Sequence, residues 1–223
     1  MFDTTSTQDR IIEATMTLAA EHDWSDVDLA KIANAAETDL GEVRGHFASR
    51  TDILKAFSAA VDREVLNRMA SRSDDGDVAR DRLFDTLMTR FEVMQPWKAA
   101  LRRLGRDPSL ALEMMPVLFN TQRWMLEAAG IPTSGARGNM RTLGTSAIYA
   151  RVIQTWLNDD DAGMAKTMVA LDSRLRRGEK FMERCGDAVD LMCGFTNVIF
   201  SRRGRDSRPE AKEPDEPIRA EPA

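Results

Sequence analysis

The residues of this 223-residue chain that most clearly carry chemistry lie in AAETDLGEVRGHFASR, residues 35–50. The stretch has the layout of a short helix that fits a groove of DNA, and Arg44 supplies a cation for phosphate contacts. It also carries Glu37, Asp39 and Glu42, where a surface that faces phosphates favours Lys and Arg. The first question is therefore whether these acids face the solvent or have local roles.

Two of the three acids fit helix caps. Asp39 can accept hydrogen bonds from backbone N–H groups at the start of a short helix, with Glu42 at its N3 position. Glu37 and Asp28 have no such role. Residues 1–70 hold thirteen Asp and Glu against seven Lys and Arg, a formal net charge of −6. Because phosphate neutralisation supplies most non-specific affinity for DNA, this segment must concentrate its cations on one face to bind DNA. The available cations are Lys31, Arg44, Arg50 and Lys55.

The sequence lacks the usual signatures of catalysis and metal binding. It contains no Gly-rich phosphate loop, no G-x-S-x-G turn and no nucleophile arrangement of Cys and His. Cys185 and Cys193 are spaced for neither a redox pair nor a zinc knuckle, so we expect reduced thiols in the core. His22 and His46 lie far apart in the sequence. We therefore predict no metal, no cofactor and no enzymatic activity.

Composition and apolar spacing predict an all-α protein, because Ala, Leu, Met and Arg are frequent and runs of Val, Ile and Thr are scarce. The N-terminal part predicts a helix over residues 8–22, two short helices and a long fourth helix. The expected capping signals are Ser25 with Asp28, Asp39 with Glu42, and Ser49 with Asp52, and the third helix is expected to turn Leu40, Val43 and Phe47 toward the core.

The remaining sequence predicts a second set of helices, over residues 77–94, 97–105, 107–129, 138–158 and 162–184. Pro116 should kink or split the third of these. We divide the chain into a head of residues 1–70, a body of residues 77–200 and a disordered tail of residues 201–223, with the boundary at residues 71–77. No run approaches the roughly 18 apolar residues that span a bilayer, and no secretion signal is found, so we expect a cytoplasmic protein.

The head resembles the TetR family of transcriptional regulators over residues 10–66. In the segment IANAAETDLGEVRGHFASRTDI the matching residues are Ile32, Ala33, Ala36, Val43, His46, Phe47, Ser49 and Ile53. Glu37 stands where the family has a turn Gly, Asp28 where it has a Thr, and Arg44 where it has a Tyr. The resemblance implies a helix-turn-helix head that binds operator DNA through Thr38, Asp39, Leu40, Gly41, Arg44, His46, Arg50 and Lys55.

The body is similar to a TetR-fold accessory family of ubiquinone biosynthesis whose members bind isoprenoid lipids. The carrying segments are RLFDTLMTRFEVMQPWKAALRRL, RWMLEAAG and IYARVIQTWLNDDDAGMAKTMVALDSRL. This resemblance implies an alternative function, a lipid-binding accessory protein that does not bind DNA. Residues 187–200, apolar and followed by Arg202, Arg203 and Arg205, would then make a peripheral membrane contact, although they would equally fit the core or a dimer partner.

Either resemblance allows a ligand pocket in the body and a homodimer. We expect an apolar small molecule or lipid, because Arg90, Arg123 and Arg151 are the few charges near the predicted pocket. The expected lining is Met88, Phe91, Met94, Trp97, Met115, Phe119 and Trp124, although such a set also fits solid core. The two long helices are expected to pair across the dimer through Val152, Trp156, Met168, Leu171 and Leu175. The leading hypothesis is a ligand-responsive TetR-type repressor.

Overall fold

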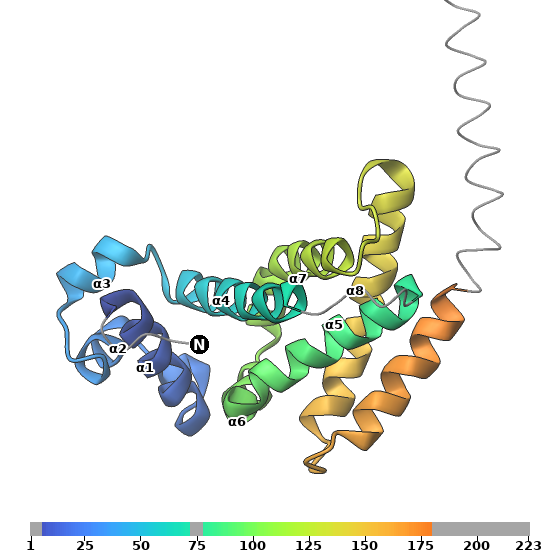
Figure 1. Cartoon of the computed structure of the whole chain (residues 1–223). Helices are drawn as coiled ribbons and strands as arrows, with labels where there is room; N and C mark the ends of the chain where they lie inside the picture. The colour runs from blue at the N-terminus through green and yellow to red at the C-terminus, as the bar shows by residue number, and fades with distance from the viewer. Residues whose placement is uncertain (1–5, 72–77, 180–223) are drawn as a thin grey trace, which may run out of the picture. The chain divides into compact units, whose positions relative to one another are not determined.

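The computed structural model describes residues 6–71 and 78–179, which belong to one compact unit, Met1–Met182. Every regular element in these ranges is a helix, which confirms the predicted all-α class (Figure 1). Most of the predicted boundary at residues 71–77 lies outside the described residues. So do the apolar segment 187–200, both cysteines and the predicted tail.

The first three helices form a small bundle. They are α1 (Thr7–Glu21), α2 (Leu29–Ala35) and α3 (Leu40–His46), with a 3₁₀ turn η1 (Trp24–Asp26) between the first two. Helix α1 contacts both short helices and buries Ile11, Ile12 and Met16. Seven-residue helices such as α2 and α3 are too short to be stable alone, so packing against α1 must hold them.

The capping predictions are confirmed at two helices and wrong in one detail. Asp39 caps α3 by accepting from Glu42 N at 2.9 Å, and Ser49 caps α4 by accepting from Asp52 N at 3.2 Å. Ser25 was expected to open the second helix, and Asp28 was not expected to act as a cap acceptor, but both expectations are wrong. Ser25 lies in η1, and the carboxylate of Asp28 caps α2. The extended backbone of Val27 places Asp28 directly before the helix, so its carboxylate can reach the backbone N–H of the first turn.

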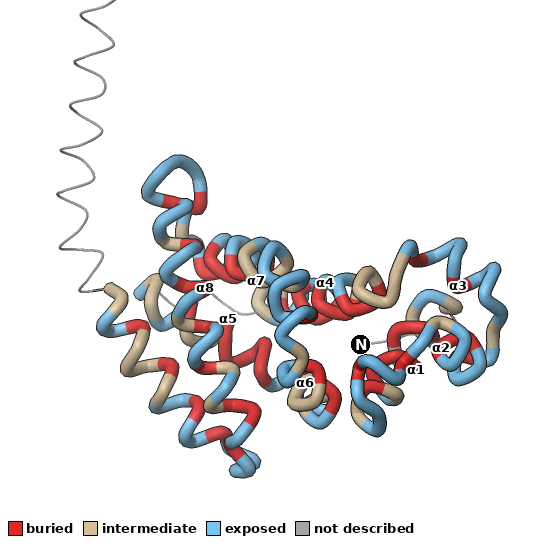
Figure 2. Tube along the Cα trace, turned by 180° about the vertical axis from the view of Figure 1, so that it is seen from behind, coloured by how far each residue is buried: buried red, intermediate tan, exposed pale blue. Residues whose placement is uncertain are grey.

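The second part of the unit is built around α4 (Arg50–Ala70), which packs against α5 and α7 (Figure 1). Its buried side chains include Phe57, Val61 and Val65. The elements that follow are α5 (Ala79–Met94), η2 (Gln95–Trp97), α6 (Lys98–Leu104), α7 (Pro108–Ala128), α8 (Gly135–Leu157) and a helix over residues 165–179. Buried residues recur along α4, α5, α7 and α8 (Figure 2).

Pro116 was expected to kink or split this helix, and the split is wrong, because α7 runs without a break over Pro108–Ala128. Pro116 is exposed, and Leu112, whose carbonyl loses its helical partner at Pro116, is exposed as well. Water can therefore reach the carbonyl that the proline leaves without an N–H donor.

The turn after α8 is fixed by polar contacts. Asp159 is fully buried and accepts hydrogen bonds from Thr167 N at 2.9 Å and from Thr167 Oγ1 at 2.8 Å. From α6, Lys98 donates to the backbone oxygen of Asp159 and Arg102 donates to that of Leu157. Burial alone would raise the pKa of the Asp159 carboxyl, but the hydrogen bonds from Thr167 and Asp161 hold this pKa below its ordinary value.

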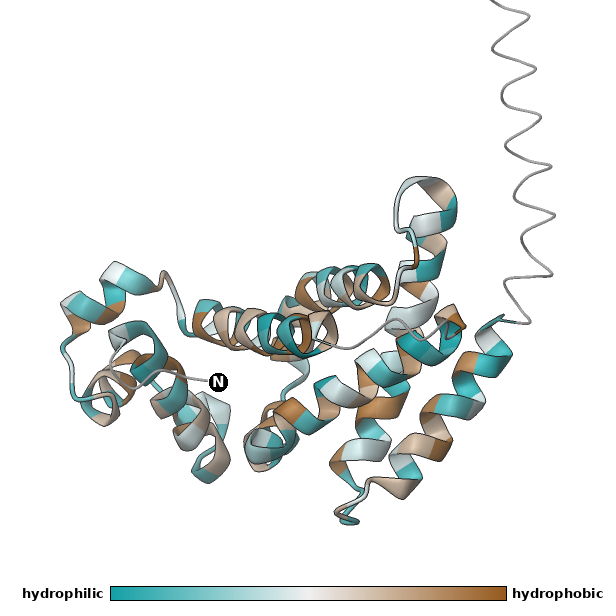
Figure 3. Cartoon of the chain, in the orientation of Figure 1, coloured by the Kyte–Doolittle hydropathy of each residue, from teal (hydrophilic) through white to brown (hydrophobic). Residues whose placement is uncertain are grey.

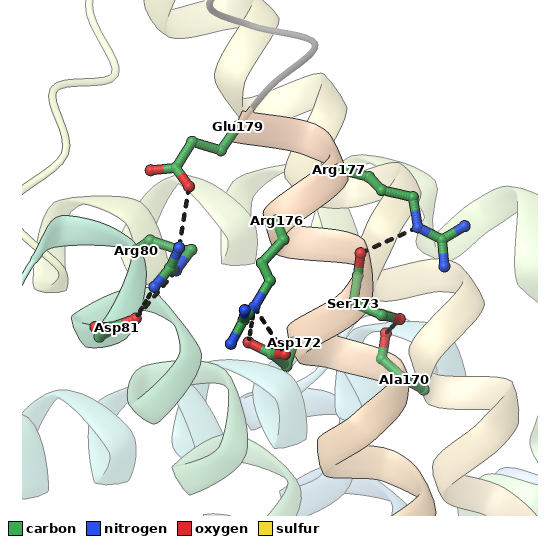
Figure 4. Close-up of polar contacts among 8 residues, drawn as sticks. All are labelled: Arg80, Asp81, Ala170, Asp172, Ser173, Arg176, Arg177 and Glu179. Atoms are coloured by element: carbon green, nitrogen blue, oxygen red, sulfur yellow. Dashed lines mark hydrogen bonds and ion pairs between the residues drawn. The ribbon is translucent and has the colours of Figure 1, made fainter.

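An ion pair between Arg80 and Glu179 connects the helix over residues 165–179 with α5 (Figure 4). Arg80, near the start of α5, lies 3.2 Å from Glu179 through its Nη1 and 2.8 Å from Asp81 through its Nη2. Within the helix over residues 165–179, Arg176 pairs with Asp172 at 3.0 Å. These pairs are partly exposed, so each contributes little stability and mainly fixes orientation.

Candidate functional site

The turn between α2 and α3 is a Schellman motif, the hydrogen-bonded ending typical of helices. Thr38 N donates to Ala33 O at 3.0 Å, and Glu37 N donates to Asn34 O at 3.2 Å. Glu37 occupies the left-handed position, with φ at +51°, which confirms that a non-Gly residue stands where positive φ is required. Helix α7 ends in the same motif but uses Gly130, with φ at +72°, at the equivalent position.

Helix α3 presents nearly all of its surface outward. Val43 is its one buried residue, and Phe47 directly after it is also buried. Leu40 was expected to face the core, but the structure leaves it 52% exposed. Leu40 lies three residues before Val43, a spacing that favours one face, but it is the first residue of a seven-residue helix, and the core contacts of Val43 and Phe47 do not extend to it.

The outer face of α3 combines small and cationic residues. Gly41 and Gly45 are four residues apart, as are Leu40 and Arg44, so each pair shares a side of the helix, and all four residues are exposed. Nothing lies within 4 Å of the position that a Cβ of Gly45 would occupy, so this side is open. No hydrogen bond or ion pair ties Arg44 to another described residue, and its guanidinium is available for an anion.

The other predicted DNA-contacting cations are already engaged. Arg50 Nη1 donates to Trp24 O at 2.7 Å and to Val27 O, and its guanidinium lies 4.9 Å from the Trp24 ring centre. Arg50 therefore ties the start of α4 to the turn between α1 and α2. Lys55 pairs with Asp52 at 2.8 Å, and hydrogen bonds from Lys55 and Ser49 lower the pKa of the Asp52 carboxyl. Sequence reasoning placed these cations near the predicted groove face but could not show their partners.

The predicted ligand-lining residues divide into two groups. The α5 residues Met88, Phe91 and Met94 are buried, and Phe91 stacks on Tyr149 with ring centres 5.3 Å apart. Trp97 is half-buried and meets Phe57 edge-on at 6.1 Å, and Phe119 is half-buried on α7. Met115 and Trp124 are 53% and 50% exposed, so the structure does not bring them to the core.

A polar cluster that sequence reasoning missed lies in this core. Arg90 Nη1 on α5 is 3.1 Å from Asp62 Oδ1 on α4, and Arg90 Nη2 donates to Ser58 Oγ at 3.1 Å. Thr121 Oγ1 on α7 donates to Asp62 Oδ2 at 2.8 Å. All four residues are buried. The signal in the sequence was Ser58, a polar residue at a helical spacing from the buried Leu54, Val61 and Val65.

Four of the five residues predicted for the dimer contact are buried by their own chain. These are Val152, Trp156, Leu171 and Leu175, and Met168 is the exposed member of the set. Other large apolar side chains are exposed nearby in sequence: Met140 and Leu143 on α8, and Val169 beside Met168. Brown, hydrophobic residues alternate with teal, hydrophilic ones along the described helices (Figure 3).

Metal-binding clusters and membrane-spanning helices are both absent from the part of the chain that the structure describes. No three His, Cys, Asp or Glu side chains within residues 6–71 and 78–179 gather in a way that could hold a metal ion. In the same ranges no helix has the length and apolar character that crossing a membrane requires.

Comparison with known proteins identifies the fold. No protein-family model and no curated protein sequence matches the chain. A TetR transcriptional regulator from Nitrosomonas europaea ATCC 19718 matches with a TM-score of 0.61 at 19% identity, over 78% of this chain and 98% of that chain. A TetR transcriptional regulator from Rhodococcus sp. RHA1 gives 0.54 at 18% over 78% and 98%, and a TetR-family regulator from Streptomyces coelicolor gives 0.51 at 13% over 87% and 91%. The chain therefore has the fold of the TetR-type transcriptional regulators.

Proposed function

We propose that this chain is a ligand-responsive transcriptional regulator, a repressor, that binds operator DNA as a homodimer. The observation that carries the proposal is the outward face of α3, where Leu40, Gly41, Arg44 and Gly45 are exposed on a helix-turn-helix head. Small residues let a helix backbone approach a groove closely, and an unpaired Arg supplies a phosphate or base contact. The likeness to solved TetR regulators supports this reading of the fold.

Hydrogen bonds to backbone N–H groups partly offset the excess negative charge of the head. The carboxylates of Asp28 and Asp39 each accept a backbone N–H at a helix start, at 2.8 and 2.9 Å. A carboxylate held in this way interacts favourably with the positive end of its helix, which reduces its repulsion toward phosphates. Glu37 is the remaining acid at the turn, and we expect it to weaken DNA binding.

The dimer is proposed to form through the exposed apolar side chains of α8 and of the helix over residues 165–179. Met140, Leu143, Met168 and Val169 supply the apolar area. Pairing of two long helices with their symmetry mates would bury these side chains in a four-helix arrangement. Two heads on one dimer would then read half-sites separated by about one turn of DNA or more.

The DNA-binding proposal is tested by fluorescence anisotropy with labelled DNA from upstream of the gene, at several salt concentrations. Arg44→Ala should weaken binding and lower the salt slope by about one charge, because one phosphate contact is lost. Arg63→Ala is the matched control: it removes the same charge from an exposed position about 20 Å along α4 from Arg50. Absence of binding at low salt, or equal losses in the two variants, would contradict the proposal.

The alternative function, a lipid-binding accessory protein of ubiquinone biosynthesis, has no support from the comparisons. Its predicted membrane contact, residues 187–200, lies outside the described residues. We therefore retain the regulator as the proposed function.

A further inference from the structure

Leu40 is the one large apolar side chain that is exposed among the described residues 6–71 of the head. It is 52% exposed, whereas the apolar residues Ile32, Val43 and Phe47 of the same turn-and-helix segment are buried. Single apolar residues on a surface are common, so exposure alone indicates no function. The position of Leu40 is informative because it belongs to α3, the helix that carries the proposed DNA contact.

The local structure of α3 does not require a Leu at this position. Asp39 caps the helix by accepting from Glu42 N at 2.9 Å, and Val43 and Phe47 make its contacts with the core. An Ala in place of Leu40 would keep the cap and these core contacts. It would also be the better helix former and would expose less apolar surface to water. A large apolar side chain here therefore indicates contact with another molecule.

The neighbour of Leu40 on the same side of α3 is a cation. Arg44 follows Leu40 by four residues, so the two side chains share a side of the helix and lie about 6 Å apart along its axis. Arg44 is exposed, and no hydrogen bond or ion pair ties it to another described residue. An exposed apolar group beside an unpaired guanidinium matches a surface that has apolar groups close to phosphates.

The major groove of DNA has such a surface, and thymine supplies its apolar group. The base edges in this groove present hydrogen-bond donors and acceptors, which a Leu side chain cannot pair, and the C5-methyl group of thymine. Phosphate contacts position a protein on DNA, whereas contacts with base edges select the sequence. We propose, on the basis of the proposed function, that Leu40 contacts the C5-methyl group of a thymine in each operator half-site and makes recognition depend on that thymine, while Arg44 contacts a backbone phosphate.

The proposal is tested with the full chain and with DNA from upstream of the gene, amplified once with dTTP and once with dUTP. Uracil pairs with adenine as thymine does but lacks the C5-methyl group. Fluorescence anisotropy gives the dissociation constant for each DNA. We expect the uracil DNA to bind about fifteenfold more weakly, because one buried methyl group corresponds to about fourfold in affinity and the proposed homodimer contacts two half-sites. Equal dissociation constants would overturn the proposal.

The variant Leu40→Ala tests the residue itself. It should bind thymine DNA and uracil DNA with equal affinity, because the side chain that contacts the methyl group is removed. The ratio of the two dissociation constants is measured on one protein sample, so a loss of folded protein does not change it. Leu112→Ala, the same substitution at an exposed position of α7, is the matched control and should keep the ratio of the unaltered chain. If Leu40→Ala keeps this ratio as well, another residue or the shape of the DNA senses the methyl groups, and the contact of Leu40 is refuted.

Failure of the thymine contact is distinguishable from failure of the proposed function. Salt-dependent binding with the same affinity for both DNAs would retain the regulator and overturn the contact. A chain that binds neither DNA would contradict the regulator and the contact together. A protein partner is the competing occupant of Leu40. It predicts that neither uracil nor Leu40→Ala changes the affinity for DNA, a result that would also overturn the contact.

Discussion

Replacing Glu37 by Gly should stabilise the chain, because Glu37 holds a left-handed conformation that disfavours every residue with a Cβ. Its φ is +51° at the end of α2, in the same hydrogen-bonded motif in which Gly130 ends α7 with φ at +72°. Glycine is the usual residue at this position because it adopts positive φ without steric cost. The chain therefore contains the same turn twice, once with the favoured residue and once without it.

The magnitude follows from two opposing terms. Relief of the left-handed strain contributes about 1–2 kcal/mol. The greater freedom of Gly in the unfolded chain offsets about 0.4–1 kcal/mol of that gain. The expected net stabilisation is about 0.5–1 kcal/mol, which corresponds to a melting temperature higher by about 1–4 °C for a chain of this size.

The assay is urea unfolding followed by circular dichroism, with two further variants. Glu37→Gln removes the charge but keeps the Cβ, so its stability should stay close to that of the unaltered chain. Gly130→Ala makes the reverse change in α7 and should destabilise by about 1 kcal/mol or more, since its Cβ would also lie 3.2 Å from Arg82 Nη2.

Glu37→Gly and Glu37→Gln together distinguish the effect of backbone strain from the effect of charge. Glu37→Gly and Glu37→Gln both remove one negative charge beside α3, so both should strengthen salt-dependent DNA binding to a similar extent. Only Glu37→Gly should also raise stability. If Glu37→Gly is no more stable than Glu37→Gln, the backbone of this turn is not strained and the reasoning is wrong.

Three further predictions concern buried or anchoring polar groups. Thr167→Val should destabilise by about 1.5–3 kcal/mol, because a hydrogen bond to the Asp159 carboxylate is lost. The pKa of Asp159 in the folded chain is held below its ordinary value of 3.8, so this stabilisation is present above pH 3.8 and is lost as the pH falls through the folded pKa. Thr167→Val should therefore lose less unfolding free energy than the unaltered chain when the pH is lowered. Arg90→Met should cost about 3–5 kcal/mol in urea unfolding, whereas adding Asp62→Leu should recover most of it, because the second change removes the uncompensated charge. Arg50→Lys should lower head stability by about 1–3 kcal/mol in hydrogen-exchange measurements, because an ammonium cannot reproduce the guanidinium contacts.

Signals between residues close together in the sequence were sufficient to predict most of the helices. Asp39 and Ser49 each cap the helix that their spacing predicted, because cap hydrogen bonds join residues only three apart. Ser25 was misplaced because Ser25 and Asp28 offer competing start signals, and the 3₁₀ turn before α2 decides between them. Leu40 was misplaced because a short helix need not bury every apolar residue.

Contacts between segments that lie far apart in the sequence could not be predicted from local signals. The guanidinium of Arg50 donates to the backbone oxygens of Trp24 and Val27, more than twenty positions earlier in the chain. The Asp62–Arg90 ion pair connects two separate helices. A single sequence carries periodicity along one helix but no information on which faces of two helices meet. For the same reason the predicted ligand pocket included Met115 and Trp124, which have the right composition but lie on exposed positions.

Helix α4 connects the buried cluster of Ser58, Asp62, Arg90 and Thr121 with the head. Ser58 and Asp62 of the polar cluster lie on this helix, about 12 and 18 Å along it from Arg50, which anchors the helix start to Trp24 and Val27. A ligand changes DNA affinity only by binding one arrangement of the protein more tightly than another. A ligand that draws Arg90 away from Ser58 would act on α4 directly, and Arg50 ties the start of α4 to the head. The effect of a ligand on DNA affinity, measured by fluorescence anisotropy, should therefore be lost when Ser58 is replaced by Ala.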